Sequence, residues 1–150
     1  MKNAILTTLY LCCLQFYVFA QKTSNLEKAS RTLNIISKHY AIENTSLLRE
    51  QFPFDSTYKA NYLGGGENEK RPNPYSYLWP FSSFLSAQVA VYRVDQDQER
   101  LTFIDNHILP GLAMYYDKRI PQGYASYIYT APESDRFYDD NIWVGIDLVD

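Results

Sequence analysis

Apolar residues recur at helical spacing in four segments of the chain. The pattern predicts helices over residues 24–40, from Pro80, over residues 98–118 and from Asp139, because steps of three and four place side chains on one face. The predicted buried faces are Leu26, Ala29, Leu33, Ile36 and Tyr40 in the first helix, Phe84, Ala87, Val91 and Val94 in the second, and Leu101, Ile104, Ile108, Leu112 and Tyr115 in the third. Pro110 should bend or divide the third helix, since it lacks a backbone N–H.

The fourth segment and the connections are less regular. Ile142, Ile146 and Val149 fit a helix, whereas the alternation Ile142-Val144-Ile146-Leu148 fits a strand, so spacing leaves both open. Residues 41–76 and 119–137 contain Gly and Pro breakers, including Gly64-Gly65-Gly66 and Pro132, and predict long loops of the kind that carry function. Helices joined by such loops predict an all-α fold. Residues 145–150 carry no C-terminal cap or Pro stop, which predicts that the chain ends inside a helix.

Residues 1–20 predict a secretory signal peptide. Lys2 precedes an apolar run that closes on Ala20, with small or modest side chains where signal peptidase requires them. One alternative is a membrane anchor, although the run is short for a bilayer of roughly 30 Å. Another is a lipid attached to Cys12 or Cys13. Cleavage would leave residues 21–150 exported to the periplasm, the cell surface or the medium, with no membrane span.

Charge and side-chain types exclude several function classes. Lys+Arg 14 against Asp+Glu 17 gives a net charge of −3 without a basic run, so nucleic-acid binding is not expected. Both cysteines leave with the signal, and His39 and His107 lack the spacing of paired ligands, so no metal or other cofactor is predicted. The aromatic content of 16%, with 14 Tyr, suits ligands that combine apolar and hydroxyl-bearing faces.

The densest cluster of polar chemistry lies in residues 134–143. Asp139 and Asp140 are adjacent at a predicted loop-to-helix junction. A helix N-terminus favours an ionised carboxylate, and repulsion between neighbours makes one of them keep its proton longer. One ionised and one protonated carboxyl is the pair that glycoside cleavage requires. The alternatives are that both residues only cap the helix, or that they bind calcium, although the usual Asp-x-Asp-x-Asp-Gly loop is absent.

Two aromatic segments could face a ligand or pack in the core. Trp79 precedes Pro80 and a predicted helix, a position from which its ring could stack on a sugar. The segment Gly123–Ile128 is short, aromatic and within a predicted loop.

Four strings, in this order, resemble family 76 of the glycoside hydrolases, and most closely the members from Bacteroidetes. They are Ser-Tyr-Leu-Trp-Pro-Phe-Ser at 76–82, Ile-Leu-Pro-Gly-Leu at 108–112, Gly-Tyr-Ala-Ser-Tyr at 123–127 and Arg-Phe-Tyr-Asp-Asp-Asn-Ile-Trp at 136–143. Members of this family are secreted endo-α-1,6-mannanases with an (α/α)6 barrel of six helical hairpins. They are much longer than this chain. The resemblance therefore implies a partial barrel, truncated after about four helices, with residues 21–150 as its N-terminal part.

The resemblance also implies a retaining mechanism on α-mannan or mannooligosaccharides, without a cofactor. Asp139 matches the nucleophile and Asp140 the acid/base. The implied substrate-binding residues are Trp79, Tyr77, Tyr138, Asn141, Trp143 and Tyr124. Tyr138, Asn141 and Trp143 would also hold the two carboxylates in place. The remaining alternatives are a non-catalytic remnant, a secreted glycan-binding helical module, or an interaction module unrelated to sugars.

Overall fold

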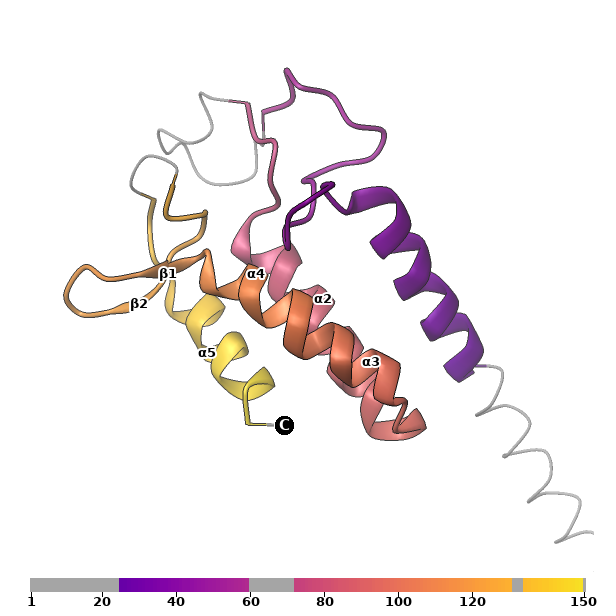
Figure 1. Cartoon of the computed structure of the whole chain (residues 1–150). Helices are drawn as coiled ribbons and strands as arrows, with labels where there is room; N and C mark the ends of the chain where they lie inside the picture. Colours follow the sequence, from indigo (N-terminus) through magenta and orange to yellow (C-terminus); the bar gives the residue numbers. More distant parts are fainter. Residues whose placement is uncertain (1–24, 60–71, 131–133, 150) are drawn as a thin grey trace, which may run out of the picture. The chain divides into compact units, whose positions relative to one another are not determined.

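The computed structural model describes residues 25–59, 72–130 and 134–149 (Figure 1). The predicted signal peptide, Gly64-Gly65-Gly66 and Pro132 lie outside the described residues. The chain divides into two compact units, residues 1–32 and 33–150. A helix over residues 25–40 begins in the first unit and ends in the second, which contains all other described elements. The described residues are mostly helical, with four helices and a minor two-stranded hairpin.

The second and third helices form a helical hairpin. Helix α2 spans Leu78–Asp95 and is followed by Gln96 in the left-handed conformation, with φ 54°. Asp97 then caps the next helix, its side chain accepting a hydrogen bond from the Glu99 N–H at 2.9 Å. Arg100 joins the two helices by donating to the buried Gln88 Oε1 at 2.6 Å, and Figure 1 shows them side by side.

Pro110 divides the third helix, as predicted. The helix consists of α3 (Gln98–Phe103), a π-helical segment η2 (Ile104–Ile108) and α4 (Leu109–Ala113), and Pro110 lies in the first turn of α4. There the Leu109 N–H donates to the Ile104 carbonyl, five residues back instead of four. This wider turn accommodates a proline that has no N–H to donate.

The predicted faces of α2 and α3–α4 are correct in part. Ile104, Ile108, Leu112 and Tyr115 are all buried, as are Phe84 and Val91 of α2. The prediction is wrong at Val94, which is 48% exposed. The buried face of α2 includes the polar residues Ser82 and Gln88. The spacing of apolar residues alone therefore does not locate this face correctly.

The third helix ends earlier than predicted, and a strand pair follows it. Instead of helix up to residue 118, Tyr116–Asp117 form β1, which pairs antiparallel with β2, Gly123–Tyr124. Segment 119–137 is therefore not entirely loop. The Ala125 N–H donates to the Tyr115 carbonyl at 2.8 Å. After α4, hydrogen bonds between residues far apart in sequence therefore replace the hydrogen bonds of a helix.

The fourth segment is a helix, not a strand. Helix α5 spans Tyr138–Asp147 and buries Asp140 and Val144. Ile142 and Ile146, the residues that predicted its buried face, are 60% and 43% exposed. The opposite face meets α2, where the Ser86 hydroxyl donates to Asp147 Oδ2 at 2.6 Å.

Candidate active site

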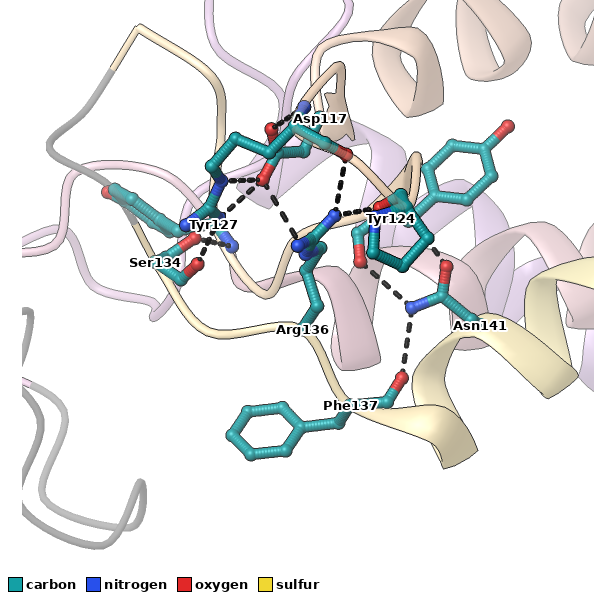
Figure 2. A network of polar contacts seen from close by, with 9 residues as sticks. Asp117, Tyr124, Tyr127, Ser134, Arg136, Phe137 and Asn141 are labelled. Carbon is teal, nitrogen blue, oxygen red and sulfur yellow. Dashed lines mark hydrogen bonds and ion pairs between the residues drawn. The ribbon is translucent and has the colours of Figure 1, made fainter.

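The first turn of α5 is fixed to the hairpin by Asn141 (Figure 2). The Tyr124 N–H donates to Asn141 Oδ1 at 2.7 Å, and Asn141 Nδ2 donates to the carbonyls of Tyr124 at 2.8 Å and Phe137 at 2.9 Å. A Cβ at Gly123 would lie 3.0 Å from Asn141 Oδ1, so the glycine makes this close approach possible. Helix α5 therefore begins at a position set by β2.

Two arginines tie the segment before α5 to the same hairpin. Arg136 Nη1 donates to the Arg119 carbonyl at 2.9 Å and to the Pro121 carbonyl, and Arg119 donates to Ser134 O at 2.6 Å and pairs with Asp117 (Figure 2). The hydrogen bonds from Arg119 hold the pKa of Asp117 below its usual range. The start of α5 is thus anchored from both sides.

Asp140 is a buried carboxyl with a raised pKa. Its exposure is 6%, and burial, followed by the charge of Asp139, raises its pKa from 3.8 to about 6. The sequence predicted a raised pKa for one carboxyl from repulsion between the neighbours, whereas burial is the larger cause at Asp140. Asp139 precedes it on the helix, turned by about 100°, and is exposed.

Asp140 faces a pocket between α2 and α5. This pocket, which we call the Asp140 pocket, has a volume of about 460 Å³. It is lined by Trp79, Ser82, Ser83, Ser86, Ala87, Ala90, Asp140 and Trp143. The small residues of α2 leave the space open, and Trp79 and Trp143 are 53% and 52% exposed. The structure therefore brings Trp79, Asp140 and Trp143 together, three of the residues singled out from the sequence.

The other predicted site residues lie elsewhere. Tyr138 is 91% exposed and lines a second pocket of about 380 Å³ with Asn141 and the 121–123 turn. Tyr124 is half-buried on β2, and burial raises the pKa of its hydroxyl. Tyr77 is only 2% exposed, accepts a hydrogen bond from Asn73 Nδ2 at 2.7 Å and packs on Tyr127. Tyr77 is thus a core residue in this structure.

Sequence reasoning missed several polar groups near Trp79. The hydroxyls of Ser82, Ser83 and Ser86 line the Asp140 pocket, and the small residues at helical spacing on α2 could have indicated it. Glu50 accepts the Tyr77 N–H at 2.8 Å, and burial raises its pKa to about 7. No local pattern marks Glu50, because its position depends on how the 41–59 segment folds back.

Within residues 25–59, 72–130 and 134–149, no three His, Cys, Asp or Glu side chains converge as metal ligands. None of the helices there is both long and apolar enough to cross a bilayer. Comparison of the chain with protein-family models and with curated proteins gave no match.

Proposed function

We propose that this chain is the N-terminal part of an exported glycoside hydrolase that cleaves α-1,6-mannosidic linkages with retention of configuration. One observation carries the proposal: Asp140 is buried, with a pKa of about 6, in a pocket flanked by Trp79 and Trp143. The resemblance of residues 136–143 to the family string supports it.

In this proposal Asp140 is the acid/base and Asp139 the nucleophile. Asp140 protonates the glycosidic oxygen as its bond to the anomeric carbon breaks, and the Asp139 carboxylate forms a bond to that carbon. A water that loses its proton to Asp140 then displaces Asp139. A pKa of about 6 for Asp140 suits an acid that works near neutral pH. The exposed Asp139 is accessible to a substrate, and a retaining pair requires carboxyl groups about 5–5.5 Å apart.

The aromatic residues supply the sugar-binding surface. The half-exposed rings of Trp79 and Trp143 present flat faces to the C–H side of a mannose. The hydroxyls of Ser82, Ser83 and Ser86, on the same helix as Trp79, donate within the chain and can accept hydrogen bonds from the hydroxyls of the sugar. This mixture of apolar faces and a few polar groups is typical of small-molecule sites.

We further propose that the helices are part of an (α/α)6 barrel. The hairpin of α2 with α3–α4 has the form of the repeating unit of that fold. The side chains of Ile142, Trp143 and Ile146 on α5 are exposed by 60%, 52% and 43%. Such an apolar surface is suited to covering by further helices.

A second candidate function is glycan binding without cleavage. It is favoured by the position of the proposed nucleophile: Asp140 lines the pocket, whereas Asp139 is exposed and is not part of the lining. Binding would require the tryptophans and the pocket but not the nucleophile.

The test is release of reducing oligosaccharides from α-1,6-mannan by the full-length protein. Asp139→Asn and Asp140→Asn are each expected to abolish release, whereas Asp105→Asn, at an exposed position on η2, is expected to leave it unchanged. Unchanged release in Asp139→Asn and Asp140→Asn would refute the site. Binding of mannan without release would favour the second candidate, and absence of both refutes both functions.

A further inference from the structure

The start of α2 is hydrogen-bonded to two other segments of the chain. The Leu78 N–H donates to the Ser126 carbonyl at 2.9 Å, and the N–H of Tyr77, the residue before α2, donates to Glu50 Oε2 at 2.8 Å. Of these two acceptors, the Glu50 carboxyl is the one that can change its charge. A hydrogen bond to an ionised acceptor is roughly twice as strong as one to a neutral acceptor, so ionisation of Glu50 tightens the hold on this end of α2.

Trp79 lies in the first turn of α2 and lines the Asp140 pocket. Its carbonyl accepts hydrogen bonds from Ser82 Oγ at 3.0 Å and Ser83 Oγ at 2.9 Å, and both serines line the same pocket. One wall of the Asp140 pocket therefore depends on where Trp79 is held. Trp79 and Glu50 also line another pocket together, of about 460 Å³.

The surroundings of Glu50 make it the group that titrates near neutral pH. Burial raises its pKa to about 7, and the hydrogen bond from Tyr77 opposes this rise. The other titratable or charged side chains around it are those of Tyr40, Arg49, Tyr115 and Tyr127. Tyrosine is neutral and arginine is charged throughout the range from about pH 6 to about pH 8, and burial raises the pKa of Tyr115 and Tyr127 further. Of these groups, Glu50 is the one whose charge changes in that range.

We propose that Glu50 is a positioning residue for the reaction at the Asp140 pocket, whose ionised carboxylate holds the Tyr77 N–H and thereby fixes Trp79 as a wall of that pocket. Tyr77 is not the only partner of Glu50 within the protein, and the proposed role requires no contact between Glu50 and a ligand. A wall that is fixed before binding needs less ordering when the substrate binds. Affinity for the substrate should therefore fall as the pH falls through about 7. This inference rests on the proposed function, since it takes the Asp140 pocket as the sugar-binding site.

The first test needs no ligand and uses the amide NMR spectrum of the full-length protein. The Tyr77 N–H resonance should move between about pH 6 and about pH 8, because its acceptor changes charge. Glu50→Gln keeps an acceptor oxygen but does not ionise, so its Tyr77 resonance should stay in place. Glu43→Gln, at an exposed turn position, is the matched control and should titrate as the wild type does. A wild-type Tyr77 resonance that does not move overturns the inference, whether or not Glu50→Gln folds.

The second test is binding of α-1,6-linked mannotetraose by titration calorimetry in the Asp140→Asn variant. There the ligand is not cleaved and residue 140 does not titrate. Affinity should fall about fivefold from about pH 8 to about pH 6. Adding Glu50→Gln should remove this pH dependence and leave the affinity at its lower value. Adding Trp79→Ala should also remove the pH dependence, because Glu50 acts through Trp79 and the two effects are then not additive.

The outcomes separate this inference from the proposed function. If wild-type hydrolysis depends on Asp140 but the pH dependence of binding is absent, or persists with Glu50→Gln or Trp79→Ala, this inference alone is overturned. If the wild-type protein neither binds nor cleaves mannotetraose, the proposed function fails and this inference fails with it.

Discussion

Replacement of Asp140 by asparagine should make the protein more stable at neutral pH. In the folded protein the pKa of Asp140 is about 6, whereas an unperturbed aspartate has 3.8. The folded state therefore holds this proton more tightly than the unfolded state. The stability that results is fully present below about pH 4 and is lost as pH rises through 6. Asparagine has the shape of the neutral carboxyl and does not ionise, so the variant avoids this loss.

The size of the effect follows from the two pKa values. A tenfold change in proton affinity is worth about 1.4 kcal/mol, so the difference between 3.8 and about 6 sets an upper value of roughly 3 kcal/mol. Solvent at the open pocket screens part of this interaction. We therefore expect the free energy of unfolding of Asp140→Asn, relative to wild type, to rise by about 1–2 kcal/mol between acidic and neutral pH.

Urea unfolding followed by circular dichroism at about pH 3.5 and about pH 7.5 measures this difference. Subtracting wild type from variant at each pH cancels the other titrating groups, including Glu50, whose raised pKa acts with the same sign. Asp105→Asn removes the same charge at an exposed position and serves as the control. A stability difference between Asp140→Asn and wild type that is the same at both pH values would refute the reasoning.

Two further predictions concern packing and anchoring. Gly111→Ala should destabilise the fold by about 3 kcal/mol, because the new Cβ would collide with the Ser46 carbonyl oxygen. Gly145→Ala, whose Cβ meets nothing within 4 Å, is the control and should be neutral or stabilise α5 by up to about 1 kcal/mol. Equal thermal unfolding temperatures for the two variants would contradict the close packing at Gly111. Asn141→Ala should lower the free energy of unfolding by about 2 kcal/mol and speed hydrogen exchange of the Tyr124 amide, and unchanged exchange would contradict the anchoring role.

The helices were predictable where the apolar residues themselves face the core. Ile104, Ile108 and Leu112 show this, since each is buried as the spacing indicates. The prediction fails in α5, where the face that meets α2 contains Asp140 and Asp147 and the isoleucines are exposed. Hydrophobic periodicity identifies the helix but not its orientation when buried side chains are polar.

The sequence predicted which residues belong to the candidate site, but not how they are arranged in space. The sequence motifs indicated Trp79, Asp140 and Trp143, and the packing of α5 on α2 brings them around one pocket. Tyr77 shares a motif with Trp79 but points into the core, since neighbours along a chain can face opposite directions. The strands were missed because β1 and β2 are two residues each, too short to show alternation.

The bonds between Asn141 and Tyr124 have a consequence for self-association. A strand at the rim of a sheet exposes N–H and C=O groups that can template the addition of a strand from another molecule. At Tyr124 both groups are already bonded to a side-chain amide, which offers the same donor and acceptor as a peptide unit. Asn141 thereby imitates a neighbouring strand one residue long. The hairpin gains protection against intermolecular strand addition without any lengthening of the sheet.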